Sequence, residues 1–283
     1  MKPAMNTTEV KFTYEGIAVT FESVHSEDHI LRAIRDSGTF YERDVLERVR
    51  EALARACRTG NAMDVGSFIG THSLFFATFC GLGHVQAFEA NPDTFPVLER
   101  NIRANGLAGK VVAANKALGS HAGNARILFG EAGNAGSTRV EFDDGDGGTQ
   151  VSTIDLEAAG AGGEISLIKI DVEGAELEVL AGGVEVIRKH RPILCVEIHT
   201  TEHLRQVLRM LDGSSYWIVD CLGWSPTYII EPTDARGLRR GLVNGAWVLR
   251  TMLPASWKGA RGYVRRLGQV LSAGWWDLSR VKA

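Results

Sequence analysis

The sequence contains few cysteines, little excess charge of either sign and no long apolar run. Its four cysteines, among 283 residues, form no Cys-x-x-Cys pair, which argues against structural zinc and against a disulfide framework. This usage fits a reducing compartment, so we expect a cytoplasmic protein. The first ten residues, MKPAMNTTEV, lack the apolar core of a secretory signal, and no stretch has the length of a transmembrane span. The formal net charge of −3 supplies no basic field that would attract nucleic acid.

Short apolar segments alternate with helical patterns over much of the chain. The predicted strands cover residues 62–65, 84–88, 111–114, 167–170 and 193–198, and helical spacing occurs at 71–80, 92–105, 174–189 and 201–211. Two later runs between residues 216 and 249, YWIVD and GAWVL, predict a closing antiparallel pair. Such alternation is typical of α/β proteins. We therefore expect a doubly wound, mostly parallel seven-stranded sheet of the Rossmann-like kind, with helices on both faces.

The pattern divides the chain into three regions. Residues 1–60 contain an alternating stretch at 9–22 with a turn at Gly16 and helical spacing at 41–58, so we expect a hairpin-and-helix cap or lid. The core covers residues 61–253, and a glycine-rich, acidic stretch at 125–156 predicts a loop or hairpin insertion in it. Residues 254–283 form a basic tail that contains tryptophan. A helix that binds a membrane surface or partner, and a packed or frayed extension, both remain open for this tail.

The segment DVGSFIG, residues 64–70, ends the first core strand and leads into a helix. Gly66 and Gly70 allow a sharp turn and the close approach of a ligand to the backbone. A dinucleotide site has the pattern Gly-x-Gly-x-x-Gly at this point, with the pyrophosphate on the helix N-terminus, and this chain is one glycine short. Asp64 would repel a pyrophosphate and would suit a cationic ligand. S-adenosylmethionine carries an ammonium and a sulfonium and no phosphate. An acidic turn that binds no ligand is the alternative.

The second core strand ends in FEANP, where Glu89 lies 19 residues beyond Gly70. At this interval an acidic residue accepts hydrogen bonds from ribose hydroxyls in dinucleotide-binding folds. Glu89 therefore indicates a nucleoside ligand without distinguishing NAD from S-adenosylmethionine. Asn91 is counted with the expected cofactor-binding residues, and Pro92 after it is acceptable in the first turn of a helix.

The order of these motifs resembles the FkbM-type O-methyltransferases. The similar segments are DVGSFIG, FEANPDTFPVLERNIRANGL, NKALGSHAG, STIDL, IKIDVEGAELEVLAGG and RPILCVEIH, within residues 61–200. The resemblance implies a class I methyltransferase fold, S-adenosylmethionine as cofactor, and methyl transfer to a hydroxyl group.

The resemblance also implies roles for single residues. It assigns Asp64, Gly66, Gly70 and Glu89 to the cofactor, and it places Asn115 near the adenine. By the same analogy, Tyr41 and Glu42 lie near the cofactor pocket. The family pattern in the first loop, Gly-Ala-Asn-x-Gly, is altered here, so an asparagine contact is missing and Ser67 is a partial replacement for it.

Acidic and histidine side chains follow two neighbouring apolar segments. Asp171 and Glu173 follow LIKI, and Glu197 and His199 alternate in CVEIHT, so that they share one direction. Ligands of open α/β sheets bind beyond the carboxyl ends of the strands. If these two strands are neighbours, the four side chains converge. We predict His199 as a general base, with Asp171 or Glu197 orienting it or the acceptor. A structural role for His199 at the start of the next helix is the alternative.

Several functions remain open at this point. The acid and histidine cluster offers ligands for Mg²⁺, but its spacing fixes no ligand count, and we do not favour a metal. The favoured function is S-adenosylmethionine-dependent O-methyl transfer to a secondary metabolite or to a sugar in a glycan. An NAD-dependent oxidoreductase is disfavoured by the missing glycine and by Asp64, and a non-catalytic nucleoside-binding protein with the same fold remains an alternative. We expect no nucleic-acid partner, and a homo-oligomer is left open.

Overall fold

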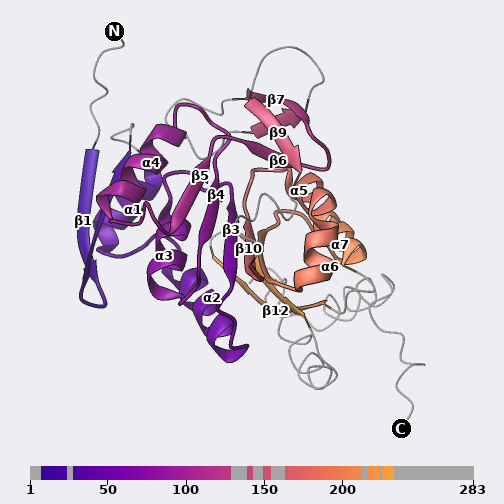
Figure 1. The fold of residues 1–283 in the computed structure, drawn as a ribbon, viewed down its shortest axis with the longest axis horizontal. Helices are drawn as coiled ribbons and strands as arrows, with labels where there is room; N and C mark the ends of the chain where they lie inside the picture. The colour runs from indigo at the N-terminus through magenta and orange to yellow at the C-terminus, as the bar shows by residue number, and fades with distance from the viewer. Residues whose placement is uncertain are drawn as a thin grey trace, which may run out of the picture.

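A seven-stranded sheet with helices on both faces forms the centre of the computed structural model (Figure 1). The structure describes residues 8–23, 28–128, 139–142, 149–153, 163–211, 216–223 and 225–232. The GAWVL segment, the basic tail at 254–283 and much of the glycine-rich insertion lie outside these ranges. No helix within them combines the length and apolarity that a membrane crossing requires.

The central sheet has the strand order β12-β13-β11-β10-β3-β4-β5. β5, β4, β3, β10 and β11 pair in parallel, whereas β13 is antiparallel to both of its neighbours. The chain reverses its direction of travel across the sheet between β3 and β10, which makes their carboxyl ends the expected ligand site. The strands are β3 (Asn61–Val65), β4 (Val85–Phe88), β5 (Val111–Ala114), β10 (Ile165–Ile170), β11 (Ile193–Glu197), β12 (Tyr216–Leu222) and β13 (Thr227–Pro232). The doubly wound, class I methyltransferase fold expected from the sequence is confirmed.

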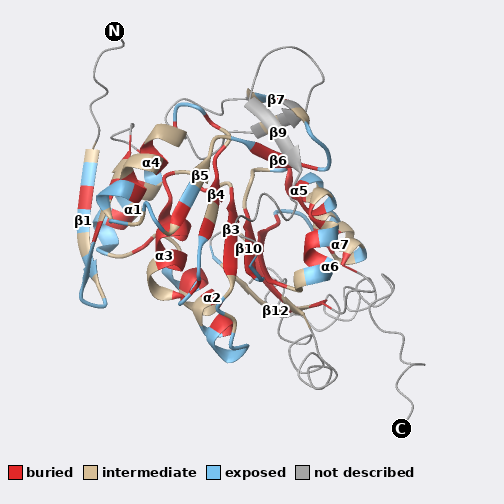
Figure 2. Ribbon diagram, in the orientation of Figure 1, coloured by how far each residue is buried: buried red, intermediate tan, exposed pale blue. Residues whose placement is uncertain are grey.

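Alternate residues of each central strand serve two separate cores. Ala62 of β3 packs with one helical layer, and Met63 and Val65 pack with the other. The first layer consists of α2 (Arg43–Arg55), α3 (Thr71–Phe79) and α4 (Phe95–Ala104), and the second of α5 (Glu176–Gly182), α6 (Val184–His190) and α7 (Thr201–Met210). The inner strands are therefore buried along their length (Figure 2). Burial on both faces explains why these strands are continuous apolar runs in the sequence.

The structure differs from the sequence prediction at several element boundaries. The helix predicted at 174–189 is two helices, α5 and α6, which meet at Gly183. The helix predicted from residue 92 begins at Phe95, because the Asp93 N–H donates to Asn91 Oδ1 at 2.9 Å and closes a turn ahead of it. The YWIVD segment lies in β12, which pairs with β13, a strand that the sequence pattern did not reveal.

One helix of the cap, α1 (His29–Ser37), was missing from the prediction. The Asp28 carboxylate begins it by accepting hydrogen bonds from the N–H groups of Ile30 and Leu31 at 2.9 and 3.0 Å. Such a short helix has only two fully buried apolar side chains, Leu31 and Ile34. Its apolar residues nevertheless recur with helical spacing, so the sequence carried a signal that the prediction missed.

The N-terminal hairpin predicted around Gly16 is present as β1 (Thr8–Tyr14) and β2 (Ile17–Ser23). Its aromatic side chains join a cluster of rings, mostly edge to face, that also includes residues of α3: Phe12, Tyr14, Phe21, Phe40, Phe75 and Phe79. Asn101 and Asn105 of α4 hydrogen-bond to the backbone of β2. The hairpin is therefore fixed to the helical layer that covers the sheet.

The insertion forms a small second sheet beside the main one. Its strand order is β6-β9-β7-β8, with β6 (Ala117–Gly119), β7 (Gly123–Leu128), β8 (Arg139–Phe142) and β9 (Thr149–Thr153). β7 and β8 are antiparallel, as a hairpin insertion requires. This sheet lies next to α5, which it contacts through β6.

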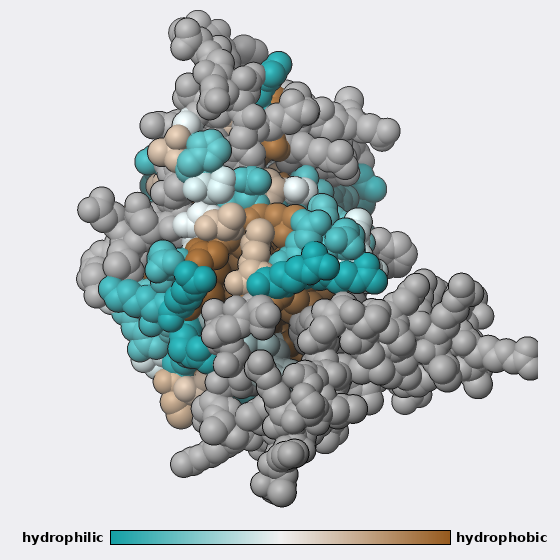
Figure 3. All heavy atoms as spheres, turned by 90° about the vertical axis from the view of Figure 1, so that its right-hand side faces the viewer, coloured by the Kyte–Doolittle hydropathy of each residue, from teal (hydrophilic) through white to brown (hydrophobic). Residues whose placement is uncertain are grey.

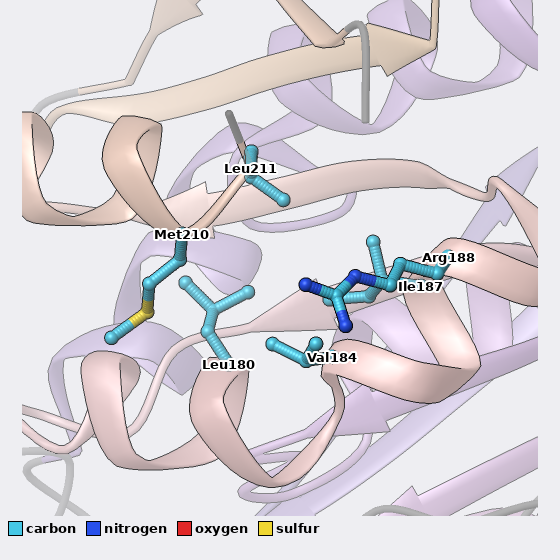
Figure 4. A pocket seen from close by; sticks show the side chains of 6 residues that line it. All are labelled: Leu180, Val184, Ile187, Arg188, Met210 and Leu211. Carbon is cyan, nitrogen blue, oxygen red and sulfur yellow. The ribbon is translucent and has the colours of Figure 1, made fainter. Parts of the chain in front are cut away.

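The layer of α5, α6 and α7 has a shallow apolar hollow on its surface. Apolar atoms are flanked by hydrophilic ones on this side of the molecule (Figure 3). The close view in Figure 4 shows the side chains that line the hollow: Leu180, Val184, Ile187, Arg188, Met210 and Leu211. They include no acid and no nucleophile. The polar cleft at the carboxyl ends of the strands is therefore the candidate functional site.

Candidate active site

An open cleft lies at the carboxyl ends of β3, β4, β10 and β11. The cleft is lined by residues of the cap, of the loops after β3 and β4, and of the ends of β10 and β11. These residues are His29, Ile30, Tyr41, Glu42, Gly66, Phe68, Glu89, Ala90, Asn91, Asp171, Val172, Glu173 and Glu197. Six predicted site residues are therefore in the lining, namely Gly66, Glu89, Asn91, Asp171, Glu173 and Glu197. The other predicted residues, Asp64, Ser67, Gly70, Asn115 and His199, lie behind or beside it.

The two glycines of the first loop are required by contacts within the chain. Gly66 has a φ of +81°, and a Cβ on it would lie 1.7 Å from the carbonyl oxygen of Asp171. Gly70 has a φ of +94°, and a Cβ there would lie 2.7 Å from Cδ1 of Leu98. Side chains rarely adopt this backbone region. Both glycines thus allow the loop to pack against β10 and α4, whether or not a ligand is bound.

Three backbone N–H groups at the start of this loop have partners within the chain. Those of Gly66 and Ser67 donate to the Phe88 carbonyl at 3.0 and 2.9 Å, and that of Phe68 donates to Glu89 Oε2 at 2.8 Å. A pyrophosphate at this position would need unpaired N–H groups. These three groups are therefore not available to a phosphate, but the N-terminus of α3 behind them has no side-chain cap, so the loop alone does not distinguish a dinucleotide from S-adenosylmethionine.

Glu89 is fixed through both of its carboxylate oxygens. Oε1 accepts from the Asn91 N–H and Oε2 from the Phe68 N–H, each at 2.8 Å, and the residue is 8% exposed. Burial raises the pKa of Glu89 to about 7, although the two backbone bonds lower it. Hydroxyl donors from a ribose would stabilise the ionised form further. Glu89 therefore has the position and the chemistry of a ribose-binding acid.

Asn115 and Ser67 shape the loops instead of lining the cleft. The Asn115 amide donates to the carbonyls of Glu89 and Ala90 at 2.7 and 3.0 Å. The Ser67 hydroxyl donates to the Asp64 carbonyl at 2.8 Å and is buried. Ser67 therefore holds the turn itself together.

Asp64 is fully buried beneath the cleft, which corrects one step of the sequence argument. Its carboxylate accepts a hydrogen bond from Ser73 and lies 3.3 Å from the ammonium of Lys169. The negative charge is thus compensated inside the protein. Asp64 does not present an uncompensated anion to a ligand, so repulsion of pyrophosphate by Asp64 does not distinguish the two cofactors.

The acids at the ends of β10 and β11 converge as predicted, because these strands are neighbours. The His199 Nε2 lies 3.2 Å from Glu197 Oε2, and Glu173, Glu197 and His199 each bring one ligand atom to within 4.8 Å of the others. Asp171 and Glu197 share a hydrogen bond. Burial and the charge of Asp171 raise the pKa of Glu197 to about 9. Burial by itself would also raise the pKa of Asp171. The charge of Lys169 and the hydrogen bond with Glu197 outweigh burial and lower the pKa of Asp171.

The cap supplies a further acid and an aromatic side chain to the cleft. Burial and the charge of Asp171 raise the pKa of Glu42 to about 7, and burial and Glu42 raise the pKa of Tyr41 to about 12. Glu42 Oε2 lies 3.5 Å from His72 Nε2. Burial and the charge of Lys169 lower the pKa of His72 to about 4. The buried His72 is therefore neutral near pH 7.

Comparison with known proteins decides the family. The profile of the family described as "Methyltransferase FkbM domain" matches residues 64–216, more than half of the chain. A relative, the hexuronic acid methyltransferase AglP of Haloferax volcanii, is 33% identical over 199 residues, which cover 69% of this chain and 77% of that protein. The chain belongs to the FkbM methyltransferase family.

Two solved structures are similar to this FkbM methyltransferase at lower identity. A methyltransferase FkbM from Methylobacillus flagellatus KT is 19% identical, with a TM-score of 0.45 over 61% of this chain. This chain spans 43% of that chain. The TYW2 protein of M. jannaschii in complex with AdoMet is 13% identical, with a TM-score of 0.41 over 81% of this chain and 88% of that one.

Three of the six described non-glycine residues with a positive φ line the cleft of this FkbM methyltransferase. Glu42, Phe68 and Glu173 all have positive φ angles, of 51°, 48° and 55°, and all three line the cleft. Left-handed backbone at residues other than glycine costs free energy and concentrates at functional sites. No sequence pattern signals these positions, since each depends on packing between separate elements.

Lys169 was not predicted as a site residue. A signal for Lys169 existed, because a lysine within the apolar run LIKI must find an anionic partner if the strand is buried on both faces. The partner could not be identified from the sequence alone. It depends on the pairing of Lys169 with Asp64 across β10 and β3.

Proposed function

We propose that this FkbM methyltransferase transfers the methyl group of S-adenosylmethionine to an oxygen of a sugar acceptor. The observation that carries the proposal is the composition of the cleft. It joins a nucleoside-compatible loop, with Gly66 and Glu89, to an acidic, histidine-containing cluster at the ends of β10 and β11. The similarity to a hexuronic acid methyltransferase supports a sugar over other hydroxyl compounds.

The residues present fit a nucleoside cofactor without phosphates. Glu89 offers a fixed carboxylate for ribose hydroxyls, and the N–H groups of Gly66, Ser67 and Phe68 already have partners within the chain. When bound, S-adenosylmethionine supplies an electrophilic methyl group on a positively charged sulfur. Asn91 stabilises the loop beside Glu89 through its turn with Asp93. Gly66 and Phe68 line the cleft beside Glu89 and would hold the cofactor together with it.

We assign the acceptor side to Glu173, Glu197 and His199. With Nε2–H of His199 directed at Glu197 Oε2, Nδ1 keeps its lone pair and can take the hydroxyl proton as the oxygen attacks the methyl carbon. Ser225 lies 3.4 Å from that nitrogen. Asp171 remains ionised and accepts the hydrogen bond of the protonated Glu197 carboxyl, which fixes the orientation of Glu197. Tyr41 and Glu42 of the cap line the same cleft and reduce its exposure to water.

The test has a binding arm and a transfer arm. Isothermal titration with S-adenosylmethionine, S-adenosylhomocysteine and NAD should show binding of the first two and not of NAD. Tight binding of NAD alone would replace the proposal with an oxidoreductase. A methyl-transfer assay then compares hexuronic acids with the matching neutral sugars. Binding of the cofactor without transfer to any sugar would contradict the sugar acceptor.

Mild alkali distinguishes the two oxygens that a hexuronic acid offers. A methyl ester on the carboxylate is hydrolysed, whereas a methyl ether on a hydroxyl survives. The proposed role of His199 predicts an alkali-stable product, since a carboxylate needs no base to attack. An alkali-labile product would still demonstrate methyl transfer, but to the carboxylate, and would exclude a general base from the mechanism.

A further inference from the structure

Lys169 occupies an unusual position for a cation. It lies within β10, a strand in which all six residues are buried, and it is itself 4% exposed. Its neighbours in register are Asp64 of β3 and Cys195 of β11. An ammonium in such a place must be paired and hydrogen-bonded, because an isolated buried charge is very costly.

The ammonium has one hydrogen bond and two ion pairs at the carboxyl ends of the strands. Nζ of Lys169 donates to the Gly66 carbonyl at 2.7 Å and lies 3.3 Å from Asp64 Oδ1 and 3.5 Å from Asp171 Oδ2. Gly66 belongs to the cofactor loop, and Asp171 belongs to the acceptor side of the cleft. Among the residues that the structure describes, the ion pairs of Asp64 and Asp171 are both with Lys169.

The same two sides are also locked by backbone contacts. The Asp171 N–H donates to the Val65 carbonyl at 3.0 Å, and the Gly66 Cα lies against the Asp171 carbonyl so closely that no Cβ fits between them. A shift of the Gly66 loop would therefore move Asp171, and the reverse also holds. The charge of Lys169 is what allows two carboxylates to remain beside this junction.

We propose that Lys169 is a positioning residue that joins the cofactor loop to the acceptor side of the cleft. Its ammonium holds the Gly66 carbonyl, neutralises Asp64 and keeps Asp171 an anion against Glu197. Lys169 touches neither cofactor nor acceptor, since it does not line the cleft. The proposal rests on the proposed function for the role of Asp171, whereas the link to the Gly66 loop is independent of it.

The charge state of Asp171 depends on groups from every element around it. The groups that act on it or respond to it are Lys169 on its own strand, Asp64 on β3, His72 on α3, Tyr41 and Glu42 of the cap, and Glu197 on β11. Lys169 is the largest influence that favours the anion. Its loss is therefore expected to raise the pKa of Asp171 by about 1 to 3 units, the usual effect of removing a nearby opposite charge.

The test compares Asp64→Asn with the double variant Asp64→Asn/Lys169→Met. Lys169→Met alone leaves the buried Asp64 and the half-buried Asp171 without a cation and is expected to unfold readily. The Asp64→Asn background removes one of these charges and keeps the Gly66 and Asp171 contacts of Lys169. Lys189→Met, on the exposed surface of α6, controls for the loss of a lysine.

Two measurements report on the two sides separately. Carbon NMR titration of the Asp171 carboxyl in the ligand-free proteins should show a pKa about 1 to 3 units higher in the double variant than in Asp64→Asn. Titration with S-adenosylhomocysteine should show a Kd at least about tenfold higher, as expected for loss of a hydrogen bond from a charged donor. Lys169→Arg in the native background should keep the pKa of Asp171 low.

A purely structural lysine would change neither measurement in the folded double variant. An Asp171 pKa within half a unit of that in Asp64→Asn, or a Kd within twofold, would overturn the joining role. The result of the Lys169 comparison can be distinguished from the result of the methyl-transfer assay that tests the proposed function. If the native protein binds the cofactor and transfers no methyl group to any sugar, the Lys169 comparison still stands on its two readouts.

Discussion

Glu89 illustrates how burial and backbone bonds prepare a single carboxylate for a polar ligand. Two N–H groups hold its oxygens in place, and only 8% of its surface remains exposed, on the cleft side. Burial raises its pKa to about 7, so the free protein holds Glu89 partly protonated near neutral pH. A ligand that donates hydrogen bonds to Glu89 stabilises its ionised carboxylate and therefore binds more tightly.

Replacement of Glu89 should therefore weaken the binding of the cofactor. Glu89→Gln keeps one acceptor oxygen but loses the charge, and we expect the Kd for S-adenosylhomocysteine to rise about tenfold or more, as for a hydrogen bond to a charged group. Titration calorimetry measures it. Glu185→Gln, at an exposed position on α6, is the matched control. An unchanged Kd in Glu89→Gln would show that the ribose lies elsewhere.

His199 should affect the chemical step without affecting the cofactor. Its side chain is 47% exposed and lies outside the cofactor side of the cleft. We expect His199→Gln and His199→Ala to reduce the single-turnover rate about 10²- to 10⁴-fold, the usual contribution of a general base, with an unchanged Kd for S-adenosylmethionine. His203→Gln on α7 serves as control. Full single-turnover rates in both His199 variants would eliminate the base assignment.

At the scale of elements, two asparagines of α4 connect the N-terminal hairpin to the core in different ways. Asn105 bonds only to the backbone of Thr20 in β2 and to its own helix. Asn101, which is fully buried, bonds to the backbone of Glu22 in β2 and also donates to the Ile69 carbonyl at 2.8 Å. Ile69 is part of the DVGSFIG loop. The hairpin is thus coupled to the cofactor loop through one side chain.

This difference gives a paired prediction. Asn101→Ala and Asn105→Ala should each lower the free energy of unfolding, by about 1 to 3 kcal/mol, because each leaves buried backbone groups without a partner. Only Asn101→Ala should also raise the Kd for S-adenosylhomocysteine, by severalfold. Denaturant unfolding and calorimetry measure the two effects. Equal Kd values in the two variants would mean that the loop does not depend on Asn101.

At the scale of the whole molecule, the cleft concentrates acids that burial makes hard to ionise. The pKa is raised to about 7 for Glu42 and Glu89 and to about 9 for Glu197, from an ordinary value of 4.5. The folded protein therefore binds more protons than the unfolded chain between pH 4.5 and these values. The resulting stability is fully present below pH 4.5 and is lost as the pH rises through the folded pKa values. His72 acts in the opposite direction, but mainly below pH 6.5.

Ligand-free protein should consequently become less stable between pH 6.5 and pH 8.5. His72 is half protonated in the unfolded chain at pH 6.5 and neutral in both states at the upper end of the window. The three acids outweigh this single group throughout, so they determine the sign. Chemical unfolding across the window measures the effect, and Glu42→Gln should show a smaller decrease than the native protein. A midpoint that rises with pH in this window would contradict the burial of these carboxyls. Saturating S-adenosylhomocysteine should reduce the slope, since ribose hydroxyls favour ionised Glu89.

The repeating local pattern and the order of motifs were readable from the sequence. Strands buried on both faces, such as LIKI, must be apolar along their length, and glycines at 66 and 70 mark a turn that side chains resist, so the α/β fold and the place of the site followed. The residues of KIDVEGAE and its neighbouring motifs were sufficient to indicate the family. These features are local or depend on strand order alone.

Only the tertiary structure decided how the charges of the site are paired. Asp64, Lys169 and Asp171 lie on two strands that are far apart in the chain, and their distances depend on the parallel register of β3 with β10. The same holds for the cap, where Glu42 meets His72, and for Asn101, which reaches both the hairpin and the cofactor loop. Residue types and spacing determine which groups are available. Whether a carboxylate faces a ligand or a buried ammonium depends on packing between distant segments, which no local pattern records.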